Sequence, residues 1–398
     1  MKKILILVCI FLLLIYNKKL SGYSYLGIDY GDVVGYYGTR NLGMGGTSIA
    51  SAEDYSMLFS NPADGYHFDK KIGVALSINY FHGNEKVMDY ETPQSYKSSF
   101  SKISLNSFGI YSRPVKSVSV AFGYHPEMDL NYKSEHYIPE TTSEKNGIKY
   151  IESSGTLNNY SFGISINIEE YGAVGISYSI IKGSQKLEQG IDYYEITGLQ
   201  DQVTKYSYKY SGAKLNFGLL GKITKTVFGG GYITPSRRIE KKEADKKYTL
   251  KFPFSYGVGI LIKSLFGYDT QFAFDFVYNS WGNFKIQQPD NEEYTPAGFH
   301  NTYEFHTGVE HILIFGKIKV PVRLGYYFQP FYANDAYDRT VFTLGAGLQG
   351  YPLPSIKFDF GLEFGKRNFL GDNAYFDNTK FIDETLLNLV LEVKYEVK

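Results

Sequence analysis

An arginine and a glutamate stand at matching positions on either side of a tight turn. Residues 315–318, Phe-Gly-Lys-Ile, are typical of a hairpin with a two-residue loop and Gly in the first loop position. This turn sets Glu310 opposite Arg323, and His306 lies further along the same face. A guanidinium can hold a ligand carboxylate, so one interpretation makes Arg323, Glu310 and His306 ligand-binding residues. The other makes them a salt bridge on a polar inner wall.

Metal binding and catalysis are less well supported. A metal site from His306, Glu304 and Glu310 lacks a second histidine that the sequence places nearby. The seven histidines are scattered, no Ser-His-Asp or Cys-His arrangement can be read from the spacing, and the only cysteine is Cys9. We therefore expect a protein that is not an enzyme and needs no metal or cofactor.

Basic residues crowd one stretch between two predicted strands. Anionic glycolipid or fatty-acid carboxylates are possible partners for such a cluster. The alternative is a solvated loop, because Glu240, Glu243 and Asp245 interrupt the run. The basic residues are Arg237-Arg238, Lys241-Lys242 and Lys246-Lys247.

Composition excludes two classes of protein. The 398 residues include 41 basic and 41 acidic side chains, so no net cationic field favours nucleic acid. The chain also has 38 Tyr, 29 Phe and 41 Gly, which is too aromatic for a disordered protein.

The N-terminus predicts export. Lys2 and Lys3 precede an apolar run over residues 4–16, and small residues follow near residues 21–24, which is typical of a secretory signal peptide. The run is too short to span a bilayer as a helix, so we assign residues 1–24 to a signal peptide. Beyond it no stretch of about 18 apolar residues occurs, and a membrane role therefore requires a β-barrel.

Strict alternation of apolar and polar residues recurs along most of the chain, for example over residues 160–168 and 356–365. Short turns and long polar loops connect the alternating segments in alternation, as in outer-membrane barrels. We expect about fourteen strands, near residues 71–83, 102–113, 115–125, 157–168, 171–183, 204–221, 225–235, 247–263, 267–280, 301–315, 317–329, 339–349, 355–365 and 386–397.

A secreted β-sandwich or propeller would alternate in the same way. However, many expected strands run to about ten residues or more, long enough to cross a bilayer when tilted. The pattern therefore favours an all-β fold, a transmembrane antiparallel barrel of about 14 strands over residues 71–398. An aromatic stripe ending in Trp281 fits the lipid-facing wall of this barrel, with a tryptophan at the membrane interface. The alternative is that Trp281, Phe284 and the stripe line a pocket. The stripe comprises Phe272, Phe274, Phe276 and Tyr278.

Residues 25–70 show no alternation and must lie elsewhere than in the wall. Ser51 to Asp54 is similar to a capping box and predicts a short helix through about Leu58, which Asn61-Pro62 ends. The lumen of a barrel this wide needs filling, so we expect residues 25–70 to form a plug. Its glycines lack the Lys-Ser/Thr of a phosphate loop and instead allow close approach to the wall: Gly43, Gly45 and Gly46.

The same region resembles a known family. Residues 38–46 (Gly-Thr-Arg-Asn-Leu-Gly-Met-Gly-Gly), Ala52-Glu-Asp54 and Asn61-Pro62-Ala63 resemble the N-terminal hatch of the FadL family of outer-membrane transporters for long-chain fatty acids and other hydrophobic compounds. Later stretches are also similar, namely Phe252-Pro253, Asp275 with Trp281 and Phe284, residues 320–326, and Gly345-Ala-Gly347. The resemblance covers nearly the whole mature chain.

The resemblance implies a fourteen-stranded barrel in the outer membrane whose plug gates an apolar pocket. It also implies lateral release of a hydrophobic ligand, such as a fatty acid, into the membrane, with Gly43, Gly45, Gly46, Asn61, Pro62 and Ala63 as the plug motif. Two other functions stay open. A barrel of the same fold can act as a shuttle that holds a protein partner, and a general porin would conduct ions.

Overall fold

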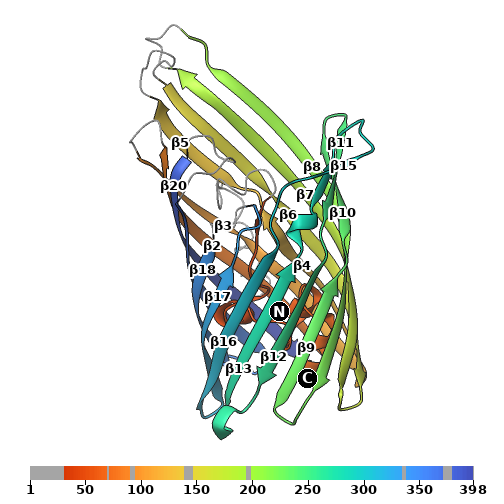
Figure 1. The fold of residues 1–398 in the computed structure, drawn as a ribbon. Helices are drawn as coiled ribbons and strands as arrows, with labels where there is room; N and C mark the ends of the chain where they lie inside the picture. Colours follow the sequence, from red (N-terminus) through yellow and green to blue (C-terminus); the bar gives the residue numbers. More distant parts are fainter. Residues whose placement is uncertain are drawn as a thin grey trace.

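The computed structural model describes residues 31–69, 71–89, 95–138, 147–193, 199–333, 338–370 and 379–397. Fourteen antiparallel strands form a closed barrel, in which the first wall strand, β2, pairs with the last, β20 (Figure 1). The predicted all-β barrel is therefore confirmed. The predicted signal peptide lies outside the described residues. The wall strands are β2 (Ile72–Asp89), β3 (Ser95–Val115), β4 (Val118–Asp129), β6 (Gly147–Ile168), β7 (Gly172–Tyr193), β8 (Gln202–Lys222), β9 (Val227–Thr234), β12 (Ser255–Ile262), β13 (Thr270–Asn279), β16 (Thr302–Phe315), β17 (Ile318–Gln329), β18 (Arg339–Gln349), β19 (Ile356–Leu370) and β20 (Thr379–Val397).

Each expected strand range overlaps a wall strand, although several wall strands, such as β6, β7 and β20, are longer than expected. One range is divided. The range 247–263 is divided into β11 (Lys246–Phe252) and β12, because Pro253 has no N–H for a ladder. β12 pairs with β9 in the wall, whereas β11 pairs with β10 (Arg237–Glu243). The basic stretch that the sequence predicts as a loop is thus a β-hairpin.

Three neighbouring wall strands are far longer than a bilayer requires. β6 and β7 have 22 residues each and β8 has 21, about twice the length of a tilted transmembrane strand. Figure 1 shows their upper halves leaning out beyond the rest of the wall. There β6 pairs with β5 (Tyr132–Ile138) and β8 pairs with β10, and the sheet continues from β10 through β11, β14 (Lys285–Gln287) and β15 (Tyr294–Pro296). We call these five short strands and the upper halves of β6 to β8 the upper sheet.

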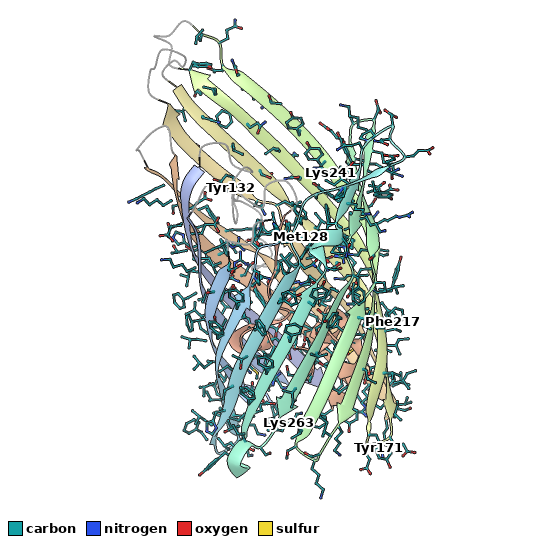
Figure 2. The ribbon with its side chains drawn as sticks, in the orientation of Figure 1. Met128, Tyr132, Tyr171, Phe217, Lys241 and Lys263 are labelled. Carbon is teal, nitrogen blue, oxygen red and sulfur yellow. The ribbon has the colours of Figure 1, made fainter. Side chains whose placement is uncertain are left out.

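The outward face of the wall carries an apolar band. Alternate residues over 160–168 on β6, 174–180 on β7 and 215–219 on β8 are apolar, and most of them are exposed. Phe217 points away from the barrel in Figure 2. A band of about nine residues matches the hydrocarbon thickness that a tilted strand crosses.

Residues 31–68, which we call the inner segment, precede the first wall strand and are almost entirely buried. Helix α2 (Thr39–Gly43) contacts β17 to β20, whereas the 3-10 helix η3 (Pro62–His67) contacts β6 to β8 on another part of the ring. A second 3-10 helix, η2 (Tyr55–Leu58), contacts β3 and β4. The inner segment therefore crosses the inside of the barrel.

The short helices of the inner segment begin at other residues than the sequence predicts. Helix η2 is capped by Asp54, whose side chain accepts a backbone N–H two residues on, and not by Ser51. Asn61, expected to end this helix, caps η3 instead by accepting the Ala63 N–H. No helix in the described part of the chain is long and apolar enough to cross a membrane.

Candidate functional site

The Asn-Pro-Ala motif fastens the inner segment to β7 and β8. The Asn61 amide donates to the Leu219 carbonyl at 3.0 Å and, within the inner segment, to Ile49 at 2.7 Å. The wall has glycines where the motif touches it: a Cβ at Gly218 would lie 2.0 Å from Asn61 Oδ1, and one at Gly175 would lie 2.4 Å from the Pro62 carbonyl. Side-chain-free strand positions therefore let Asn61 and Pro62 reach the backbone.

Three glycines of the inner segment contact the opposite part of the wall, on β16 to β18. Gly45 has φ +68°, and a Cβ there would lie 2.3 Å from the Thr307 carbonyl oxygen. Its N–H donates to Thr343 Oγ1 at 2.9 Å. Gly43 lies against Gly345, and Gly46 lies against His306. Gly45 thus meets two requirements that only glycine satisfies together, a left-handed backbone and direct contact with the wall.

We expect Gly45→Ala to detach the inner segment from the wall. Alanine at positive φ costs about 1–2 kcal/mol, and the added methyl would clash with backbone rather than with a movable side chain. Trypsin cleavage after Arg40, which is buried in the intact protein, measures the release. Gly316→Ala is the matched control, since Gly316 has φ +64° with nothing within 4 Å. Equal resistance of both variants to trypsin would contradict the prediction.

Buried ion pairs join helix α2 to the wall. Arg40 donates from Nε and Nη2 to the Glu310 carboxylate at 3.2 and 3.1 Å. Arg323 donates to Glu310 at 2.5 Å and to Asp359 at 2.6 Å. The predicted register of Glu310 opposite Arg323 is confirmed. Together the four side chains form a continuous network of two cations and two anions between β16, β17, β19 and the inner segment.

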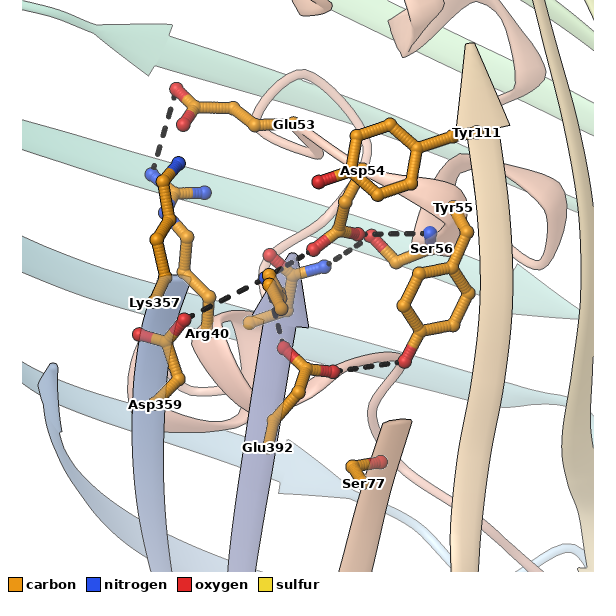
Figure 3. Close-up of polar contacts among 12 residues, drawn as sticks. Arg40, Glu53, Asp54, Tyr55, Ser56, Ser77, Tyr111, Lys357, Asp359 and Glu392 are labelled. Atoms are coloured by element: carbon orange, nitrogen blue, oxygen red, sulfur yellow. Dashed lines mark hydrogen bonds and ion pairs between the residues drawn. The ribbon is translucent and has the colours of Figure 1, made fainter. Parts of the chain in front are cut away.

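The network continues through Lys394 on β20. Its ammonium contacts Asp359 at 3.7 Å, Asp54 at 2.5 Å and Glu392 at 2.9 Å, and Glu392 accepts a hydrogen bond from the Tyr55 hydroxyl at 2.9 Å (Figure 3). Burial alone would raise the pKa of the Asp54 carboxyl, but the neighbouring ammonium lowers this pKa to about 2. Asp54 therefore stays ionised and holds η2 to the wall.

The structure separates the three residues that the sequence groups as ligand-binding. Arg323 and Glu310 lie in the buried network, with their charges already balanced. His306 lines a cavity, where Nδ1 donates to the Gly45 carbonyl at 2.8 Å and Nε2 lies 3.5 Å from Glu304. A ligand-binding role for Arg323 and Glu310 stays a prediction. Among the described residues, no group of three His, Cys, Asp or Glu side chains is placed to hold a metal.

The cavity lies between the inner segment and the upper part of the barrel and has a volume of about 110 Å³. Its floor includes Ser48 and Ile49, whose N–H groups donate to Asp275 of β13 at 2.6 and 2.9 Å. Its wall carries two cations that share one carboxylate: Lys214 lies 3.3 Å from Glu127, and Arg237 binds the same oxygen.

An aromatic cluster borders the cavity, and three of its members, Met128, Phe252 and Trp281, line it. Trp281 stacks on Tyr332 with ring centroids 4.3 Å apart, and Phe252 meets Trp281 edge-on. The prediction of Trp281 at the membrane interface is wrong, because a 3-10 turn, η6 (Trp281–Asn283), directs it inward, where it is 7% exposed. The full cluster comprises Met128, Leu130, Leu157, Ile181, Tyr210, Ile239, Leu250, Phe252, Trp281, Phe284, Phe299, Phe331 and Tyr332.

The ladder between β3 and β4 is incomplete. The two strands pair from their shared turn up to Phe108 and Tyr124, and above that level no ladder joins them among the described residues. β4 continues to Asp129, paired with β6 on its other side. The upper part of β4 therefore has an edge that β3 does not cover.

The start of the inner segment occupies this edge. β1 (Asp32–Val33) pairs with Asp129 and Met128 of β4. Arg339 of β18 and Arg367 of β19 bind the carboxylate of Asp32, the first residue of β1. Backbone pairing and buried ion pairs thus hold β1 in place. The alternation pattern does not predict this strand, because β1 is only two residues long.

Comparison with solved structures identifies proteins of the same fold. A Pseudomonas aeruginosa FadL homologue matches with a TM-score of 0.64 and 13% identity over 92% of this chain and 100% of its own. The Ralstonia pickettii toluene transporter TbuX matches with 0.64 and 13% over 92% and 99%. The P. putida toluene transporter TodX matches with 0.65 and 14% over 91% and 99%. At these identities the likeness concerns the fold.

A search of curated proteins finds no match. The model of the BamG family, in contrast, matches residues 1–252, more than half of the chain and including the whole inner segment. Together with the FadL-like barrel, this match shows that the chain belongs to the BamG family, a FadL-like family of outer-membrane proteins.

Proposed function

We propose that this protein lies in the outer membrane and transports hydrophobic molecules. The proposal rests on the cavity between the inner segment and the aromatic cluster. Its lining combines charged groups with apolar side chains such as Phe59, Phe252 and Trp281, and the apolar part can receive an apolar molecule. Similar solved structures include two toluene transporters, which supports cargo of this class.

We propose that the inner segment is the plug of this transporter, as predicted for residues 25–70. Gly43, Gly45 and Gly46 contact one part of the wall and Asn61-Pro62-Ala63 contacts another. When β1 leaves β4, the cavity opens sideways between β3 and β4 into the bilayer. The cargo would leave by this lateral route.

Within this class we propose long-chain fatty acids as cargo. Lys214 and Arg237 share Glu127 as their partner at the cavity wall, so a ligand carboxylate can compete for the two cations. The volume of about 110 Å³ is below the roughly 150 Å³ of a cavity that binds benzene. A long alkyl chain therefore enters only as the plug moves.

Trp281 offers a direct test, because it is the only tryptophan of the chain and lines the cavity. We expect oleate added to the purified protein in detergent to change the Trp281 emission with saturation, whereas glucose leaves it unchanged. A saturable response to toluene but not to oleate would assign the cavity to neutral aromatic molecules. Absence of any saturable response would contradict transport through this cavity.

We expect Val277→Phe, which fills the cavity, to weaken the Trp281 response at least roughly tenfold. Val277 faces the cavity from β13, and ligand and ring would compete for the same space. Val258→Phe is the matched control, since Val258 faces outward on β12 and is 52% exposed. Equal affinities for both variants would place the ligand elsewhere.

A shuttle or binding barrel is the second candidate, favoured by the upper sheet. β6 to β8 extend well beyond the apolar band and offer a surface for a protein partner. Cross-linking in native membranes distinguishes the two functions: a stable partner on the upper sheet, with no saturable Trp281 response, would favour the shuttle.

A further inference from the structure

The outward side of the upper sheet is strongly basic just above the apolar band. On β7 the outward-facing residues run through Ile176, Tyr178 and Ile180, and the next is Lys182, which is exposed. We call the following set the basic face: Lys182, Lys209, Arg238, Lys242, Lys247, Lys251 and Lys285.

The strand register aligns six of these side chains in two rows. In the upper row, Lys209 of β8 lies opposite Lys242 of β10, which lies opposite Lys247 of β11. Directly opposed residues of an antiparallel pair project from the same face. Three ammonium groups therefore stand side by side across three strands.

The lower row follows the same rule. Arg238 of β10 lies opposite Lys251 of β11, which lies opposite Lys285 of β14. The intervening Ile239 and Leu250 belong to the aromatic cluster inside the protein. Because neighbouring residues of a strand point to opposite faces, both rows point outward, on the side of the membrane lipid.

Carboxylates beside the two rows are too few to balance their charge. Glu240, between the rows, contacts Lys247 at 2.5 Å and Lys242 at 3.6 Å. Lys209, Lys251 and Lys285 form no ion pair with any described carboxylate. Like charges directly opposite each other destabilise a sheet, so each row is favoured by anions supplied from outside the chain.

The height of the rows identifies the anion. The ladder between β8 and β10 begins at Gly212 opposite Ile239, so the lower row lies at the top of the apolar band. Lys242 lies four positions beyond Arg238, about 13 Å along the strand and about 10 Å along the membrane normal at a strand tilt of about 40°. This spread exceeds the single headgroup layer of a phospholipid, roughly 7 Å thick on each side of the hydrocarbon core. It fits a headgroup that carries phosphates at more than one level.

We propose that the basic face binds a phosphorylated glycolipid of the surrounding outer leaflet. Lysine and arginine pair with its phosphates, while the apolar band below packs against its acyl chains. This site rests on the outer-membrane placement alone and is independent of the cavity and its cargo.

The test compares two triple variants in equilibrium binding of lipopolysaccharide to the folded protein in detergent. Lys209→Gln with Lys242→Gln and Lys247→Gln removes the upper row. We expect affinity to fall roughly 100-fold, from a contribution of about 1 kcal/mol for each basic residue. The matched control carries the same three changes at exposed lysines in turns at the opposite end of the barrel: Lys116, Lys225 and Lys317.

A second variant, Arg238→Gln with Lys251→Gln and Lys285→Gln, tests the lower row independently and is expected to weaken binding by a similar factor. Undiminished binding by both row variants would overturn the proposal, as would an equal loss in the control. Phosphatidylglycerol bound as tightly as lipopolysaccharide, or displacement of lipopolysaccharide by millimolar inorganic phosphate, would also overturn it. The Trp281 response to oleate should be unchanged in every variant, which separates this site from transport.

Discussion

A disulfide between β1 and β4 is expected to stop uptake of a hydrophobic compound while it is oxidised and to restore uptake when it is reduced. Val33 and Met128 are directly opposed across the two strands and both line the cavity. Such a pair has Cα atoms about 4.5–5.5 Å apart, within the range of a disulfide. Because the predicted mature chain contains no cysteine, Val33→Cys with Met128→Cys forms one defined cross-link.

Uptake of radiolabelled oleate by cells, before and after a reducing agent, measures this effect. We expect at least a tenfold loss in the oxidised state, since β1 can no longer leave the edge of β4. Ser161→Cys with Ser179→Cys is the matched control, because these residues are also opposed but join two wall strands. Unchanged uptake with β1 locked would show that cargo does not leave through the gap between β3 and β4.

Glu310→Gln is expected to release the inner segment and convert the closed barrel into an ion-conducting one. Glu310 is 3% exposed and is the shared partner of Arg40 and Arg323. Removing one member of a buried ion pair costs about 3–5 kcal/mol, because the remaining charge is left without compensation. Single-channel recordings in planar bilayers should show steady conductance for the variant and none for the parent protein.

Glu240→Gln is the control for loss of one carboxylate, since the ion pairs of Glu240 lie on the surface and contribute at most about 1 kcal/mol. The double variant Glu310→Gln with Arg40→Gln removes one charge of each sign and should recover part of the closed state. A closed Glu310→Gln barrel would show that this network does not hold the inner segment.

Local sequence determined much of this protein. Alternation predicts the wall strands because the side chains of a strand point to opposite faces whatever its neighbours are. Gly316 in a two-residue turn determines that Glu310 faces Arg323, since the turn alone sets the register of a hairpin. The glycines at positions 43, 45 and 46 and the Asn-Pro-Ala motif mark the segment that crosses the lumen, because close backbone contact tolerates few residue types.

Only the tertiary structure decided which partners these residues meet. Arg40 is 270 positions from Glu310, and no local pattern relates the two. Trp281 is directed inward by a short turn that breaks the alternation before it. The basic stretch around Lys242 forms a hairpin rather than a loop because β8 supplies an edge for it. These features arise when the barrel closes and encloses its own N-terminal segment. Closure buries charges that are distant in sequence, and a buried charge must find a partner.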